Sequence, residues 1–496
     1  MTGQYERGAG ILMHISSLPG DKSIGTLGRP AYDFVDFLKS AGQKYWQVLP
    51  ICPVGYGFSP YQSPSTFAGN PLFIDFALLE EDGLLTKKDY AKYIGKSIST
   101  VDMLLTHDRV EVLYKAFERF KTQDHTDFHR FEAENEVWIS NYAMYQAGKD
   151  VFDNLPWFRW QDKIKHRDSE ALWHFKNDNG DRVFFHMFVQ YEFYKQWERL
   201  KKYANDNGIK IIGDIPIYVA LDSADVWVSP NLFDLNADLS PSHVAGCPPD
   251  AFSATGQLWG NPIYNWTAHE RDNYAWWVNR IKQSLKLYDL VRIDHFRAFA
   301  SYYAISGTDK TAEHGQWIEG PGMKLFDKLE EQLGALPFIA EDLGTITPDV
   351  KELLQKTGFP GMKILEFAFD EANAPSDYLP QNHIKNCVVY PGTHDNNTIL
   401  GWIEENKENA AFAKKYLGLE ETATSDALRL AIIRAALMSP ADISIVQLQD
   451  YLALDDKARM NTPSTVGTNW TWRWTPSQIT PDLSKQIKDL TKTYFR

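Results

Sequence analysis

Three carboxylates, each placed after a short apolar run, are of the type and spacing that could break and remake a glycosidic bond. Asp294 and Glu341 directly follow such runs, and Asp395 follows another run through a short polar turn. Short apolar runs are typical of buried strands, and in a parallel barrel the functional groups lie where such strands end. One carboxyl could act as nucleophile, a second as proton donor, and a third could bind a sugar hydroxyl.

Each acid also has a purely structural interpretation. Arg292 precedes Asp294 by two residues, so both side chains share one strand face, where the guanidinium would keep the carboxylate ionised or form a structural ion pair. Apolar neighbours of Glu341 would suppress its ionisation and suit a general acid, whereas a helix cap or a lysine partner is the alternative. His394 and Asp395 could bind vicinal hydroxyls or form an Asx turn, and the two roles are compatible.

Further candidates lie in loops and at one more strand end. Asp214 ends an apolar run, where a structural role and ligand binding are equally compatible with the sequence. Tyr61 lies among Gly, Ser and Pro, which fits a rigid platform for a sugar ring or an ordinary Pro-rich turn. Residues 246–262 carry Gln257 and Trp259 between glycines and prolines, as in a lid or an irregular surface loop. Phosphate-binding glycine loops and HExxH are absent, which argues against nucleotide and zincin chemistry.

These residues must be positioned by a repeated pattern of strand and helix. Amphipathic segments with helical spacing lie between apolar runs, as in a parallel α/β sheet, and eight such runs predict a (β/α)8 TIM barrel. The strand candidates are residues 10–14, 45–50, 209–214, 290–294, 338–341, 362–366, 387–390 and 443–448. The clearest helical patterns cover residues 31–40, 274–287, 324–333, 347–355 and 427–438.

Uneven spacing between these runs predicts large insertions around the C-terminal rim of the strands. Residues 77–199 are too many for one crossover and have helical periodicity, so we expect a mostly helical subdomain there. Residues 221–277 are rich in proline and are expected to be loop-like, with residues 246–262 as a lid. Because no linker, repeat or low-complexity segment occurs, residues 1–496 are expected to form a single catalytic barrel domain.

Composition narrows the class of protein further. The net charge of -14 at pH 7 disfavours nucleic acid and anionic membranes as partners. Three cysteines give neither a disulfide framework nor a metal-binding pair, so we expect a reducing compartment and no metal. Sixteen tryptophans favour an aromatic or carbohydrate ligand. Without a signal peptide pattern or a long apolar stretch, a cytoplasmic protein is expected.

Ordered motifs along almost the whole chain carry a family resemblance. They are His14-Ile-Ser-Ser-Leu-Pro-Gly, Gly57-Phe-Ser-Pro-Tyr-Gln-Ser-Pro-Ser, Gly213-Asp-Ile-Pro-Ile-Tyr-Val-Ala, Pro248-Pro-Asp through Trp259-Gly-Asn-Pro, Arg292-Ile-Asp-His-Phe-Arg, Ala340-Glu-Asp-Leu-Gly, Gly392-Thr-His-Asp-Asn and Arg459-Met-Asn. With them the sequence resembles the 4-alpha-glucanotransferase family of the alpha-amylase-like barrels, also called amylomaltase or disproportionating enzyme.

The resemblance implies a role for each site residue. It implies Asp294 as nucleophile, Glu341 as general acid/base and Asp395 as the stabiliser of the distorted sugar. The residues implied for the central subsite are Tyr61, Asp214, Arg292 and His394, and those for flanking subsites are Ser59, Gln257, Trp259, Asp370 and Asn461.

The activity that the resemblance implies is transfer of a segment of a 1,4-alpha-D-glucan to the 4-hydroxyl of glucose or another glucan. It would follow a retaining double displacement without any cofactor. The implied partners are maltooligosaccharides, alpha-1,4-glucans and glucose, with the chain as monomer or homodimer. An alpha-glucan hydrolase of the alpha-amylase type is the nearest alternative. A metal-dependent barrel isomerase and a non-catalytic glucan-binding protein are alternatives from other classes.

Overall fold

A parallel sheet that curves into a barrel is the centre of the fold. The computed structural model describes residues 5–96, 98–249, 253–371 and 376–496, and eight strands among them form this sheet in the order β10-β11-β12-β1-β2-β3-β6-β9. At its two ends, Ala340 N–H donates to Pro360 O over 2.9 Å and joins β9 to the entry of β10. The (β/α)8 prediction is therefore confirmed. The strands are β1 (Gly8–Leu12), β2 (Tyr45–Gln47), β3 (Lys210–Ile215), β6 (Leu290–Ile293), β9 (Phe338–Ala340), β10 (Gly361–Ile364), β11 (Cys387–Tyr390) and β12 (Ile443–Gln447).

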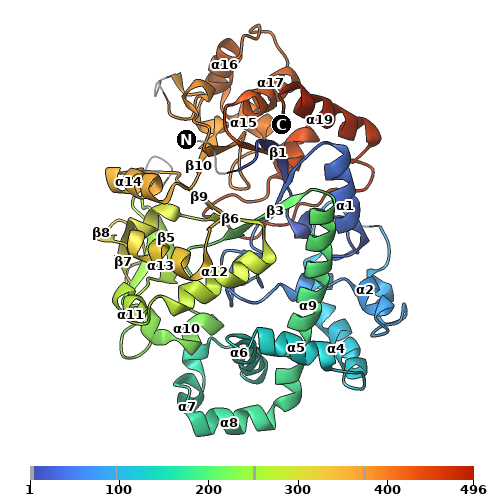
Figure 1. The fold of residues 1–496 in the computed structure, drawn as a ribbon, viewed down its shortest axis with the longest axis vertical. Helices are drawn as coiled ribbons and strands as arrows, with labels where there is room; N and C mark the ends of the chain where they lie inside the picture. The colour runs from blue at the N-terminus through green and yellow to red at the C-terminus, as the bar shows by residue number, and fades with distance from the viewer. Residues whose placement is uncertain (1–4, 97, 250–252, 372–375) are drawn as a thin grey trace.

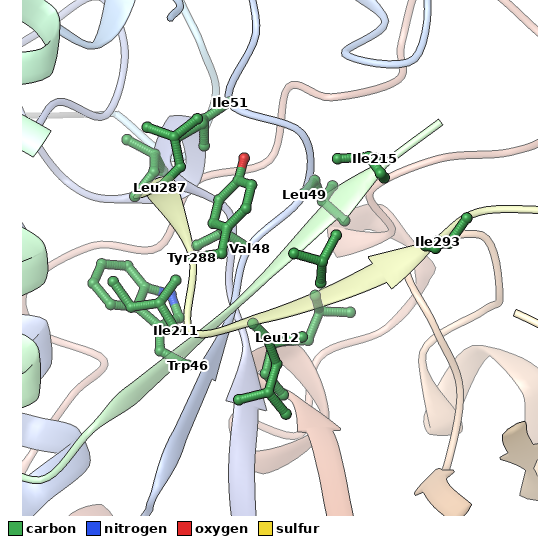
Figure 2. Packing of buried hydrophobic residues seen from close by; sticks show 14 of the residues in the cluster. Leu12, Trp46, Val48, Leu49, Ile51, Ile211, Ile215, Leu287, Tyr288 and Ile293 are labelled. Atoms are coloured by element: carbon green, nitrogen blue, oxygen red, sulfur yellow. The ribbon is translucent and has the colours of Figure 1, made fainter. Parts of the chain in front are cut away.

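Packing between the barrel strands and the surrounding helices makes the largest hydrophobic core. Figure 2 shows Trp46, Ile211 and Tyr288 close together beside the strands, and all three are almost completely buried. Gly213 of β3 is required here, because a Cβ at this position would lie 2.1 Å from the Tyr288 ring. The missing side chain lets the ring approach the strand, and the other face of β3 is left to Asp214.

Helices between the strands cover the outside of the barrel (Figure 1). The five segments with helical patterns all form helices, within a few residues of the expected ends. Pro30 at the start of α1 and Pro348 at the start of α14 suit the first helical turn, where no backbone N–H is needed. The helices of the barrel are α1 (Arg29–Ser40), α9 (Gly180–Asp206), α12 (Ala275–Leu287), α13 (Met323–Leu333), α14 (Pro348–Thr357), α15 (Ile399–Glu405), α16 (Lys407–Tyr416), α17 (Ser425–Met438), α18 (Leu448–Tyr451) and α19 (Pro481–Thr493).

Between β2 and β3 the chain forms a helical region that is tied to the barrel by α9. Figure 1 shows α9 running from the barrel to this region, where α4, α5 and α6 pack against it. Aromatic rings fill the contact: Tyr114 of α4 stacks on Phe185 of α9 with 3.7 Å between ring centroids. No helix in the described ranges is both long and apolar enough to cross a membrane. The remaining helices here are α2 (Phe76–Glu81), α3 (Met103–His107), α4 (Arg109–Phe120), α5 (Thr126–Glu134), α6 (Ile139–Val151), α7 (Asp162–Lys165) and α8 (Ser169–Asp178).

A second, antiparallel sheet lies in the segments around β6. Within the described residues its order is β5-β4-β7-β8, and β4 pairs with β7 across some sixty residues of sequence. Within residues 221–277, which were expected to be loop-like, the chain also forms two strands and two short α-helices. Residues 250–252 of the expected lid lie outside the described residues. The elements are α10 (Ala224–Val228), β4 (His243–Cys247), β5 (Gln257–Pro262), α11 (Trp266–Arg271), β7 (Ser301–Ser306) and β8 (Gly315–Glu319).

Candidate active site

Asp294 and Glu341 directly follow two neighbouring strands of the barrel, β6 and β9. The register of β6 and β9 pairs Ile293 with Ala340, so the next residue on each strand is one of the two acids. Glu341 Oε2 accepts from His295 N–H over 2.6 Å, and His295 directly follows Asp294. His295 has a φ of 53°, in the left-handed region. A non-glycine residue in this conformation costs energy and is typical of functional sites.

Removal from water raises the pKa of both acids. Burial raises the pKa of Asp294 to about 8, and the negative charges of Asp214, Glu341 and Asp395 add to this, while Arg292 opposes it. Burial also raises the pKa of Glu341, and Arg292 and two backbone N–H groups oppose that rise. Two acids so close titrate as a pair, and the pair retains one proton at neutral pH. A carboxylate and a carboxylic acid are therefore available together.

Arg292 is the cation that holds two of the acids. Its Nη1 lies 2.8 and 2.7 Å from the two oxygens of Asp214, the residue paired with it in the strand register. Its Nη2 lies 3.0 Å from Asp294 Oδ1. Arg292 and Asp214 are almost fully buried, whereas the Asp294 side chain keeps 29% of its surface exposed. Asp294 is thus the member of this group that remains open to a ligand.

Tyr61 and His394 form the wall beside Asp214. The Tyr61 hydroxyl donates to Asp214 Oδ2 over 2.8 Å and lies 2.9 Å from His394 Nε2. Because the hydroxyl has one proton, His394 Nε2–H must donate to the Tyr61 oxygen. Burial lowers the pKa of His394, so the imidazole is neutral. The two rings are stacked with centroids 5.3 Å apart, and Trp470 packs on both. Tyr61 is therefore fixed by its neighbours.

Asp395 lies in a turn that follows β11. Asn396 closes this turn, since its Oδ1 accepts from the Thr393 N–H and hydroxyl over 2.9 and 2.8 Å. The helix that follows, α15, is capped by Thr398, whose side chain accepts from Gly401 N–H. Asp395 Oδ1 instead accepts from Asn461 Nδ2 over 2.6 Å and lies 3.4 Å from His394 Nε2. Its side chain is 43% exposed.

The other candidates lie around this centre. Ser59 Oγ accepts from Tyr61 N–H over 3.2 Å. Trp259 Nε1 donates to Gln257 Oε1 over 3.1 Å, and the Trp259 ring packs edge-on against His295 with 4.8 Å between centroids. These contacts connect Ser59, Gln257 and Trp259 to the centre. Asp370 follows the 3-10 turn Leu365–Phe367 after β10 and is half-buried.

Three residues not assigned a role from the residue pattern belong to the site. They are His295, Arg459, whose Nη2 donates to Asp395 O over 2.6 Å, and Trp470, which covers Tyr61 and His394. Arg459 lies in the Arg-Met-Asn motif, and this motif could have indicated that Arg459 belongs to the site. His295 has no pattern that reveals its backbone conformation. Trp470 is one of three closely spaced tryptophans, and no local feature separates it from its neighbours.

The arrangement combines two partly exposed acids, Asp294 and Asp395, and the buried Glu341 with fixed polar partners at the carboxyl ends of the strands. A sugar placed over Asp294 would meet a nucleophile, a proton donor in Glu341, and hydroxyl-binding groups in Asp395 and His394. Each of these groups is held by hydrogen bonds or packing before any ligand arrives. Such pre-organisation is what catalysis by positioned charges requires.

Comparison with known proteins assigns the family. A family model described as 4-alpha-glucanotransferase matches residues 13–479. The 4-alpha-glucanotransferases of Clostridium butyricum and Streptococcus pneumoniae are 48% and 47% identical, over 98% and 99% of this chain and 100% and 98% of theirs. The structure of amylomaltase from Streptococcus agalactiae in complex with acarbose superimposes with a TM-score of 0.95 and 43% identity, covering 99% of this chain and all of that one. The chain belongs to the 4-alpha-glucanotransferase family.

Proposed function

We propose that this protein transfers a segment of a 1,4-alpha-D-glucan to the 4-hydroxyl of glucose or of another 1,4-alpha-glucan. The pairing of Asp294 with Glu341 at neighbouring strand ends carries this proposal, because a retaining enzyme needs two carboxyls only about 5 Å apart. Neighbouring strands lie about 4.8 Å apart, which fits this need. The family membership supports glucan as the substrate.

In the proposed reaction, Asp294 attacks the anomeric carbon while Glu341 protonates the departing glycosidic oxygen. The resulting covalent glycosyl-enzyme is attacked by the acceptor hydroxyl, whose proton returns to Glu341. Two inversions give net retention. Asp395 and His394 bind hydroxyls of the distorted sugar, and Arg292 stabilises the carboxylate that is regenerated on Asp294. No step needs a cofactor, since the carboxyls perform both the bond and the proton chemistry.

We assign the surrounding residues to sugar subsites. Tyr61, Asp214 and Arg292 complete the central subsite, supported by the chain of contacts from Asp294 to His394. The flanking subsites are assigned to Ser59, Gln257, Trp259, Asp370 and Asn461. An indole beside the central subsite gives a sugar acceptor an apolar face on which to stack and excludes water from the intermediate, which favours transfer over hydrolysis.

Incubation with maltotriose tests the activity. We expect a ladder of longer maltooligosaccharides together with glucose, separated by chromatography, and no ladder with the Asp294→Asn variant. Products that are only shorter than maltotriose would instead identify an alpha-glucan hydrolase. If activity were lost on chelation and restored by magnesium, a metal-dependent reaction would replace this proposal.

We expect kcat/KM to show a bell-shaped dependence on pH. At low pH both Asp294 and Glu341 are protonated and no nucleophile is present. As pH rises past about 8, the last proton of the pair is lost and the leaving oxygen is no longer protonated, so the rate falls. Initial rates of transfer from maltotriose across this range measure both limbs. A rate that keeps rising through the alkaline limb would contradict a shared proton.

We further propose that the protein is cytoplasmic and acts as a monomer or homodimer. Its proposed partners are maltooligosaccharides, alpha-1,4-glucans and glucose, and it binds neither nucleic acid nor a membrane. The charge of -14 supports this choice of partners. We propose one catalytic domain with a helical insertion over residues 77–199 and a second insertion over residues 221–277. Residues 246–262 act as the lid, supported by the position of Trp259 next to His295.

A further inference from the structure

The segment Arg459–Met460–Asn461, here called the clamp, lies against the turn that carries Asp395. Asn461 N–H donates to His394 O over 3.1 Å, and Arg459 Nη2 donates to Asp395 O over 2.6 Å. Arg459 Nε also donates to Asn461 O over 2.8 Å, so the guanidinium joins the turn to the clamp. One side chain therefore fixes the backbone on both sides of the contact.

The clamp is itself anchored in the protein. Met460 is buried, and its carbonyl accepts from Trp470 N–H over 2.7 Å. Ser17 Oγ donates to Met460 Sδ over 3.4 Å, which ties the clamp to the loop after β1. The charge of Arg459 also opposes the rise in the pKa of buried Glu366, whose backbone N–H donates to Pro391 O at the start of the turn. The clamp is thus a fixed support and not a free loop.

Asp395 needs such a support more than the other acids do. With 43% of its side chain exposed and no arginine or lysine of the described residues bound to its carboxylate in the way that Arg292 binds Asp294, it depends on neutral donors for its orientation. The 2.6 Å hydrogen bond from Asn461 Nδ2 is shorter than the 3.4 Å contact of this carboxylate with His394 Nε2, and it selects one rotamer. Without it, part of the binding energy of a distorted sugar would be spent on ordering the side chain.

We infer that Arg459 and Asn461 are positioning residues, which aim the Asp395 carboxylate at the distorted sugar before the sugar binds. The inference rests on the proposed role of Asp395 in the reaction. Arg459 sets the backbone of the turn, and the Asn461 amide sets the carboxylate. Asn461 acts through Asp395, in addition to any contact of its own with a flanking sugar.

A double-mutant cycle on acarbose binding tests this inference. By isothermal titration we expect Asn461→Ala to weaken acarbose binding roughly tenfold in the wild-type background, the effect of losing one hydrogen bond to a charged group. In the Asp395→Ala background the same change should cost clearly less affinity, since the carboxylate that it aims is gone and only a contact of Asn461 with a flanking sugar is left to lose. An equal loss in both backgrounds would mean that Asn461 acts only through its own contact with the ligand, and would overturn the inference.

Kinetics separate positioning from substrate binding. With maltotriose, Asn461→Ala should lower kcat roughly tenfold and leave KM within about twofold, because the lost interaction matters in the transition state. A raised KM with unchanged kcat would contradict this. Arg459→Lys, which keeps the charge but not the two-way hydrogen bonding, should give a smaller loss of kcat in the same direction.

Asn469 provides a matched control in the same loop. Its amide bonds only Thr462 and Thr465 among the described residues, so Asn469→Ala should lower the thermal midpoint without changing kcat or acarbose affinity. Equal kinetic losses in Asn469→Ala and Asn461→Ala would indicate general loosening of the loop. Asp395→Ala that retains wild-type turnover would refute the proposed role of Asp395 itself, a result distinct from failure of the clamp.

Discussion

Replacement of Asp294 by asparagine is expected to lower transfer from maltotriose by roughly four orders of magnitude, with the fold retained. The amide has nearly the same shape as the carboxyl, so the side chain still fits beside Arg292. It cannot form the covalent bond to the anomeric carbon, however, and no neighbouring group replaces it: Glu341 is held by two backbone N–H groups, and Asp214 is buried behind Arg292. Turnover near the wild-type rate, with an unchanged circular dichroism spectrum, would refute the assignment.

Replacement of Glu341 by glutamine is expected to affect a glucan donor more than a donor with a good leaving group. Glu341→Gln should lower transfer from a glucan by roughly two to four orders of magnitude, since the departing sugar oxygen needs a proton. An alpha-maltosyl fluoride donor needs far less protonation, so its fluoride release should be much less affected. Asp342→Asn is the matched control: Asp342 Oδ1 accepts from Met362 N–H over 2.6 Å, a contact that the amide oxygen can keep. Equal losses with both donors would exclude Glu341 as the general acid.

The barrel could be predicted because its signal is local. Each of the eight runs is apolar since its strand is buried in the core, and each ends near an acid or a turn. The antiparallel sheet was missed for the opposite reason. Strand β8 (Gly315–Glu319) is largely exposed, and β4 combines glycine, cysteine and histidine. These strands form because distant segments pair with one another, as β4 does with β7, and no run of residues reveals such pairing.

The site shows the same division between local and distant signals. The placement of Asp294 and Glu341 follows from strand ends and could be foreseen. The side-chain partner of Asp395 could not, because Asn461 lies 66 residues away along the chain and reaches it only through the fold of the last third of the protein. Likewise, an Asx turn at Asp395 that caps the next helix was an alternative from the sequence, but the side chain that accepts within this turn is Asn396, from Thr393 N–H, and Thr398 caps the helix.

Arg292 is the residue whose loss should affect both stability and activity most. Arg292 is 3% exposed and is paired with Asp214, which is 1% exposed. Among the described residues, the only other side chain that donates a hydrogen bond to Asp214 is Tyr61. Arg292→Met would leave Asp214 buried without a cation, and breaking a buried ion pair in this way costs about 3–5 kcal/mol. The midpoint of urea-induced unfolding should therefore fall clearly, as measured by fluorescence of the buried tryptophans.

A second substitution separates the two effects of this change. In Arg292→Met combined with Asp214→Asn, the uncompensated charge is removed, so we expect the unfolding midpoint to return most of the way to that of the wild type. Activity should not return, because Asp294 still lacks the cation that opposes the rise in its pKa and the wall of the central subsite has changed. If the double variant were as unstable as Arg292→Met alone, the instability would come from the lost packing of the arginine and not from the unpaired carboxylate of Asp214. Recovery of stability without turnover would show that the buried pair serves the site more than the fold.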